Sequence, residues 1–119
     1  MGFKFEKLTV WQKAIDLTAD VNSVVKKFPT DERFVLSPQM QRAADSVALN
    51  IAEGSTGQSN KEFARFLGIA LRSGIEVVSC LYVAQRRNII NQKDFDRLYD
   101  ALTEITKMIQ ALRRTLRTD

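Results

Sequence analysis

Apolar side chains recur at alternating spacings of three and four residues along most of the chain, and this periodicity limits the possible folds more than any other feature. In the first segment the repeating positions are Val10, Ala14, Leu17, Val21, Val24 and Phe28. In the last segment they are Phe95, Leu98, Leu102, Ile105, Ile109, Leu112 and Leu116. Because this spacing places side chains on one face of a helix, the chain is predicted to be all-α.

Capping residues and prolines predict the bounds of the first two helices. Thr9 is a suitable N-cap for the first helix, and Pro29 is expected to end it, because proline disfavours helical geometry in the residue before it. Ser37 and Pro38 predict the start of the second helix, with the hydroxyl as the cap and proline at the first helical position. Gly54 is expected to end that helix as a left-handed residue.

Polar caps also mark the third and fourth helices. Ser59 and Glu62 have the spacing of a capping box, in which each side chain accepts a hydrogen bond from the other residue's backbone. Asn88 is expected to terminate the third helix, and Asn91 is expected to cap the fourth. Four helices joined by short connections predict an antiparallel up-down-up-down four-helix bundle.

Length and composition predict one globular domain over residues 1–119, with a short extended arm at residues 1–8. No apolar run approaches the roughly 18 residues that a membrane span needs. The first residues are charged where a signal peptide would be apolar. We therefore expect a cytoplasmic protein without a membrane partner.

The stretch from Asn50 to Leu67 resembles a phosphate-binding loop at first sight, because it contains Gly54, Gly57 and Lys61. A P-loop, however, follows a strand and has the pattern G-x-x-x-x-G-K-[ST]. Here the two glycines are too close together, no Gly-Lys pair is present, and a helix precedes the loop. The stretch is therefore predicted to be a connection between two helices.

The residue types argue against catalysis. The chain has no histidine, which is the commonest general base and metal ligand, and its single cysteine excludes an internal disulfide or a multi-cysteine zinc site. Cys80 lies among apolar residues and is predicted to be a buried structural thiol. Scattered carboxylates such as Glu53 and Asp94 leave a magnesium-dependent nuclease as the remaining enzymatic alternative. We predict no enzyme, no catalytic residue, no metal site and no cofactor.

Two features suggest self-association. The first helix carries apolar residues beside its main row, and small residues allow helix axes to approach closely in the second and third helices. The alternative is that these residues accommodate bulky neighbours within a single bundle. The candidate oligomer-interface residues are Trp11, Ile15, Thr18, Val25, Leu49, Gly68 and Gly74.

The net charge is +4, from 18 basic and 14 acidic side chains, and the predicted topology collects cations at both ends of the bundle. Helix-dipole complementation and solubility account for part of this pattern. Repeated around an oligomer, the same cations would bind a nucleic-acid backbone with weak sequence preference. The candidate nucleic-acid-binding residues are Lys4, Lys7, Lys13, Arg42, Arg65, Arg72, Arg86, Arg87, Arg113, Arg114 and Arg117. Arg72 and Glu76, four residues apart, are expected to pair with each other.

Four stretches, in order, carry a family resemblance: "FEKLTVWQKAIDL", "FP", "LSPQMQRAADSVALNIAEG" and "KEFARFLGIALRSGIEV". With them, the chain from about Phe5 to Arg117 resembles the bacterial four-helix bundle proteins encoded in intervening sequences of 23S ribosomal RNA genes. The "VWQKA" and "NIAEG" blocks are the most specific parts. The matching positions include Trp11, Lys13, Arg42, Asn50, Glu53, Gly54, Phe63, Arg72 and Glu76.

The resemblance implies a homopentameric, barrel-like assembly without enzymatic activity. Relatives in this family include the accessory variability determinant of diversity-generating retroelements, a basic protein that partners a reverse transcriptase. That branch implies RNA or DNA binding, with a reverse transcriptase or another protein as partner. Our leading hypothesis is therefore an oligomeric, non-enzymatic bundle that binds nucleic acid, linked to 23S rRNA intervening sequences or a mobile element. The alternative is a protein–protein adaptor whose basic residues only keep it soluble.

Overall fold

The computed structural model describes residues 2–57 and 59–116, and helices account for nearly all of them. Two short 3-10 helices are η1 (Lys4–Lys7) and η2 (Thr30–Glu32). The four long helices are α1 (Thr9–Val25), α2 (Leu36–Ser55), α3 (Asn60–Arg86) and α4 (Gln92–Thr115). No strand occurs among the described residues, so the predicted all-α class is confirmed.

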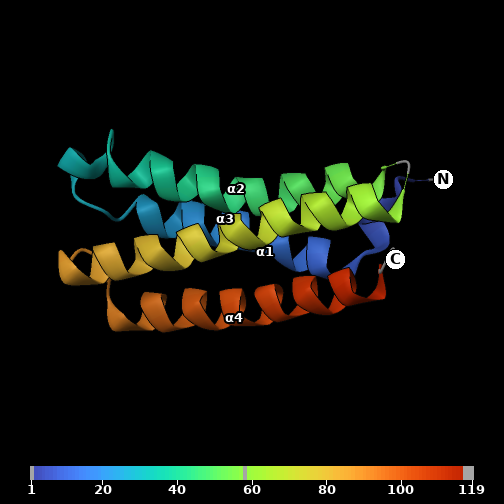
Figure 1. Cartoon of the computed structure of the whole chain (residues 1–119). Helices are drawn as coiled ribbons and strands as arrows, with labels where there is room; N and C mark the ends of the chain where they lie inside the picture. Colours follow the sequence, from blue (N-terminus) through green and yellow to red (C-terminus); the bar gives the residue numbers. More distant parts are fainter. Residues whose placement is uncertain (1, 58, 117–119) are drawn as a thin grey trace.

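Each long helix runs opposite to the one before it (Figure 1). Three ion pairs show the antiparallel arrangement of α1 and α4, because residue numbers rise along α1 as they fall along α4. The pairs are Lys13–Glu104, Asp20–Arg97 and Lys27–Asp94. The two chain ends therefore lie at the same end of the bundle (Figure 1). The arrangement is the up-down-up-down bundle that the sequence predicts.

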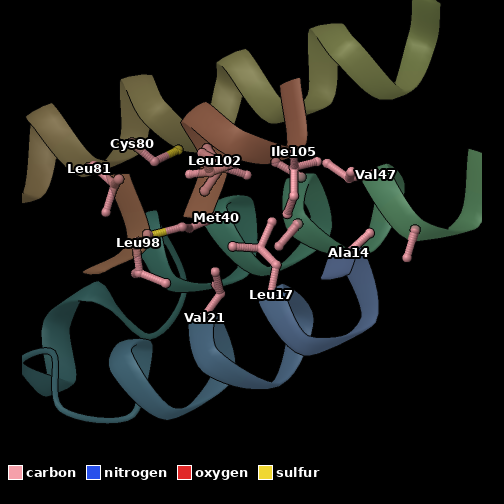
Figure 2. Packing of buried hydrophobic residues seen from close by; sticks show 14 of the residues in the cluster. Ala14, Leu17, Val21, Met40, Val47, Cys80, Leu81, Leu98, Leu102 and Ile105 are labelled. Carbon is pink, nitrogen blue, oxygen red and sulfur yellow. The ribbon is translucent and has the colours of Figure 1, made fainter. Parts of the chain in front are cut away.

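The predicted apolar rows meet along the axis of the bundle (Figure 2). Leu17 of α1, Met40 of α2, Leu81 of α3 and Leu102 of α4 are all at most 2% exposed. Cys80 lies in the same cluster, and burial, followed by the nearby charge of Glu76, raises the pKa of its thiol. A raised pKa keeps the thiol protonated and unreactive, as expected for a structural cysteine.

The structure corrects the predicted starts of α1 and α2. Thr9 is the first helical residue, and Leu8 occupies the N-cap position without a side-chain cap. The backbone of η1 leads directly into α1, and the Leu8 N–H group donates to the Phe5 carbonyl. Similarly, α2 begins at Leu36, so Ser37 and Pro38 lie inside its first turn rather than before it.

Gly54 is also placed differently from the prediction. It lies within α2, is buried, and no described glycine has a positive φ. A Cβ atom added to Gly54 would lie 2.6 Å from the Cβ atom of Phe66. Glycine is required here because the last turn of α2 presses against α3, and the helix ends one residue later, at Ser55.

The predicted N-cap residues of the later helices are confirmed, but only one half of the capping box predicted at Ser59 is formed among the described residues. Ser59 Oγ accepts a hydrogen bond from the Glu62 N–H group at 3.1 Å, and Asn91 Oδ1 accepts from the Asp94 N–H group at 2.7 Å. The Glu62 carboxylate accepts from Arg65, so it supports the helix by an ion pair within α3. Asn88 follows α3 with a φ of 59°, the left-handed geometry of a helix terminator.

One described helix, α3, is long and apolar enough by length and composition alone to cross a membrane. Such a stretch was not expected from the sequence, because no unbroken apolar run is long enough to span a membrane, whereas α3 mixes apolar residues with uncharged polar ones. Nine of its residues are buried, including Leu67, Val77 and Leu81, and they pack in the bundle core. These contacts account for part of the apolar character of α3, whereas Ile75 and Tyr82 on the same helix are exposed.

Candidate nucleic-acid interface

Two cations at the end of the bundle farthest from the chain termini are engaged by carboxylates, whereas Lys26, Arg33, Arg86 and Lys93 at that end are exposed and have no carboxylate partner among the described residues. Lys27 Nζ lies 2.9 Å from Asp94 Oδ2, and Arg87 Nη1 lies 2.9 Å from Glu32 Oε2. Arg87 is one of the predicted nucleic-acid-binding residues, and Lys27 lies at the same end of the bundle. The charges of Lys27 and Arg87 are balanced by Asp94 and Glu32, which weakens their electrostatic attraction for an external phosphate.

Asp94 is the best-buried carboxylate of this network, with 4% of its surface exposed. Hydrogen bonds from Lys27 and then Arg97 hold the pKa of Asp94 below its usual value. Arg97 in turn forms a two-pronged contact with Asp20 on α1, and hydrogen bonds from Asp20 and then Asp94 raise the pKa of its guanidinium. The network links α1 to α4 and is structural.

Two further candidate cations also have acidic partners. Lys13 Nζ lies 2.9 Å from Glu104 Oε1, and Arg65 Nη2 lies 3.1 Å from Glu62 Oε1. Both pairs are substantially exposed, so they stabilise the fold weakly. They leave little uncompensated charge at those two positions.

The end of the bundle that carries the chain termini differs. We call Lys4, Lys7, Arg113 and Arg114 the cationic end, because none of them has a carboxylate partner within residues 2–57 and 59–116. Lys4 and Lys7 lie on η1 and are exposed, and Arg114 is exposed in the last turn of α4. Arg117, the fifth cation predicted for this end, lies outside the described residues.

Arg113 is less exposed than the other three residues of the cationic end. Its guanidinium lies over Gly68 of α3, where an added Cβ atom would be 3.3 Å from Nη2. Its Nε atom is buried and has no hydrogen-bond partner in the described part of the chain. Lys4 of η1 also contacts the start of α3, because Lys4 Nζ lies 5.9 Å from the centre of the Phe63 ring.

The other candidate cations are dispersed. Arg42 and Arg72 are exposed in the middle of α2 and α3, and Arg86 is exposed at the last residue of α3. None of these three belongs to the cationic end. The expected pair of Arg72 with Glu76 is not among the ion pairs of the described residues; Glu76 instead accepts a 3.5 Å hydrogen bond from Gln39.

The predicted oligomer-interface residues fall into two groups. Ile15 is 39% exposed and Leu49 is 66% exposed, so both are available for contact. The others pack within the chain. Trp11 is half-buried against Phe5, Thr18 and Val25 are half-buried along α1, and Gly68 and Gly74 face Arg113 and Thr106 of α4.

Sequence reasoning missed a groove of about 820 Å³ between the outer faces of α3 and α4. Ile75, which is 57% exposed, and Tyr99, which is 38% exposed, lie along it. Lys107 and Arg114 are the charged residues that line it. A signal was present in the sequence: Leu71, Ile75 and Val78, which line the groove, follow one another at spacings of four and three residues on one face of α3.

No metal centre is formed by the described residues, among which no three histidine, cysteine or acidic side chains gather. The carboxylates with polar contacts among the described residues take part in ion pairs, helix caps or hydrogen bonds to glutamine side chains. The geometry therefore offers an uncompensated cationic surface and an apolar groove, both of which suit binding.

Comparisons with known proteins agree with this architecture. The chain is similar to a crystal structure of a protein with unknown function from the S23 ribosomal protein family of Bacteroides thetaiotaomicron VPI-5482, with 25% identity and a TM-score of 0.83. The similarity covers 88% of this chain and 98% of that one. No curated protein was found to match. A profile of the 23S rRNA-intervening sequence proteins matches residues 6–111. The chain therefore belongs to the 23S rRNA-intervening sequence protein family.

Proposed function

We propose that this protein binds RNA or DNA through the cationic end and catalyses no reaction, in a role linked to 23S rRNA intervening sequences or a mobile element. One observation carries the proposal. Lys4, Lys7, Arg113 and Arg114 all lack carboxylate partners among the described residues, whereas at the other end two of the cations, Lys27 and Arg87, are paired, so part of the charge there is neutralised. Uncompensated cations clustered at one end are what a phosphate backbone requires, because its affinity comes from counterion release.

We further propose that copies of the chain assemble into a homopentamer. The exposed apolar side chains of Ile15, Leu49, Ile75 and Tyr82 support this, since contact with other copies would remove them from water. The resemblance to intervening-sequence proteins supports the pentameric number. In a ring, one cationic end per copy would line up into a continuous binding surface, which makes weak single contacts additive.

A salt titration with two matched variants tests the nucleic-acid proposal. Binding of a labelled RNA is measured between low and physiological salt for the wild type and for Lys4→Glu/Lys7→Glu. The double variant is expected to bind more weakly at every salt concentration, and the slope of log affinity against log salt should become shallower by about two. The control is Lys26→Glu/Lys93→Glu, which makes the same charge change at exposed positions away from the cationic end. Equal loss in both variants would reduce the effect to net charge and contradict the proposal.

The groove between α3 and α4 favours a second candidate function, that of a protein–protein adaptor. Its walls are mostly apolar, and Ile75 and Tyr99 present their side chains to solvent there. An adaptor would bind a partner protein and would not bind RNA, even at low salt. The wild-type titration therefore separates the two functions without any variant.

A further inference from the structure

Three aromatic rings form a stack at the cationic end. The ring of Phe3 stacks on that of Phe5, with centroids 5.9 Å apart and planes inclined by 19°. Phe5 meets Trp11 of α1 edge to face, with centroids 4.7 Å apart. Exposure rises outward along the stack, because Trp11 and Phe5 are half-buried and Phe3 is 67% exposed. The outermost ring therefore offers much of its surface to a ligand.

Local hydrogen bonds hold this stack in place. The Phe3 N–H group donates to Glu6 Oε1 at 2.7 Å, and the Glu6 N–H group donates back to the Phe3 carbonyl at 3.1 Å. Gln12 Nε2 donates to the Glu6 carbonyl at 2.8 Å, which fixes η1 against the first turn of α1. A ring that is already positioned loses little conformational freedom when a ligand binds.

The charges around the stack suit a polyanion. Lys4 lies between Phe3 and Phe5 in the sequence, Lys7 follows two residues after Phe5, and both lysines are exposed. Glu6 is the one acidic side chain of η1, and the Phe3 backbone N–H group already binds it. An aromatic ring flanked by cations is the arrangement used to bind single-stranded nucleic acid, in which bases stack on the ring and the backbone contacts the cations.

We propose that Phe3 is a stacking platform for an unpaired nucleobase, so that the ligand of the cationic end is single-stranded. This inference rests on the proposed nucleic-acid binding and names the class of nucleic acid. A base within a duplex is stacked between its neighbours and presents no free face to the ring, whereas a single strand can turn its bases outward. Lys4 and Lys7 contact the phosphates on either side of the stacked base.

The test compares a fluorescein-labelled 12-nucleotide oligouridine with a 12-base-pair RNA duplex at fixed salt. Phe3→Ala is expected to weaken binding of the oligouridine by about tenfold and to change duplex binding less than twofold. Phe3→Trp should retain oligouridine binding, because indole also stacks. The matched control is Phe34→Ala, which removes a phenylalanine that is 85% exposed in the connection between η2 and α2.

The readouts separate this inference from the proposed function. If the wild type binds neither RNA, both fail. If the wild type binds oligouridine and Phe3→Ala binds it equally well, the stacking platform is wrong and the cationic end stands. An equal loss of oligouridine and duplex binding in Phe3→Ala would also overturn the inference. So would a smaller assembly mass in light scattering, because Phe3 would then pack against another copy. The slope of affinity against salt should be unchanged in Phe3→Ala, since no cation is removed.

Discussion

Lys27 Nζ contacts Asp94 Oδ2 at 2.9 Å, across 67 residues of sequence, and joins the end of α1 to the first turn of α4. The second carboxylate oxygen of Asp94 contacts Arg97 Nη1 at 2.7 Å. Asp94 therefore holds two cations while its own surface is almost completely buried. Loss of its charge would leave both cations without this partner.

We expect Asp94→Asn to lower the free energy of unfolding by about 1–3 kcal/mol, because it removes charge-assisted hydrogen bonds at a buried position. Urea denaturation followed by circular dichroism measures the change. Asp96→Asn is the control, since Asp96 is exposed and lies on the same helix. A loss in Asp94→Asn no larger than in the control would contradict the structural role of the network.

The same carboxylate predicts a dependence of stability on pH. Its pKa is lowered in the folded state, so its stabilising contribution is fully present above the unfolded-state pKa of about 3.9. The contribution is lost as the pH falls through the folded-state pKa. The difference in unfolding free energy between the wild type and Asp94→Asn should therefore be constant near neutral pH and shrink below about pH 4. Urea titrations at several pH values check this, and a difference that grew on acidification would contradict the sign.

Substitution by alanine is expected to have opposite effects on stability at two glycines of neighbouring helices, Gly54 and Gly68. Gly54→Ala should destabilise the fold by about 1–3 kcal/mol, because the new Cβ atom would clash with the Cβ atom of Phe66 at 2.6 Å. Gly68→Ala should be neutral or stabilising by up to about 1 kcal/mol, because alanine favours the helix and the nearest atoms are at the flexible end of Arg113. Thermal melts of both variants measure the contrast, and similar shifts would refute it.

Assembly can be tested at the groove between α3 and α4. If other copies cover this surface, Ile75→Glu should reduce the mass measured by light scattering, because a charge would be placed in an apolar contact. The helical content should be unchanged, since Ile75 is 57% exposed in one chain. Gln85→Glu, at an exposed position of α3 outside the groove, is the control. An unchanged mass in Ile75→Glu would place the contact between copies elsewhere, with Ile15 and Leu49 the next positions to test.

Much of the fold was predictable, because it depends on patterns within single helices. The rows that begin at Val10 and Phe95 are buried along most of their length, and the caps at Ser59 and Asn91 form as predicted. The errors occur where neighbouring elements decide the outcome. Gly54 was assigned to a turn by its residue type, but the approach of Phe66 determines its conformation.

The candidate site was less predictable, because charge pairing joins residues that are distant in sequence. Nothing local to Arg87 shows that Glu32, 55 residues earlier, neutralises it. Equally, the exposure of Phe3 depends on how η1 packs against α1, whereas the sequence shows only an aromatic residue beside a lysine. The composition therefore predicts a basic protein, and the packing decides which cations remain available.

The antiparallel order of the helices has a consequence for how the chain folds. The contacts of α1 with α2, α2 with α3, and α3 with α4 each join consecutive helices, so helical hairpins can form through local contacts, which favours rapid folding. Among the pairs of long helices that pack extensively, the contact of α1 with α4 is the one that joins segments far apart in the sequence. Formation of the contact between α1 and α4 therefore carries the largest loop-closure entropy. The residues that form ion pairs across this contact are Asp20, Lys27, Asp94 and Arg97. Charge changes at these residues should act mainly on the unfolding rate of the bundle.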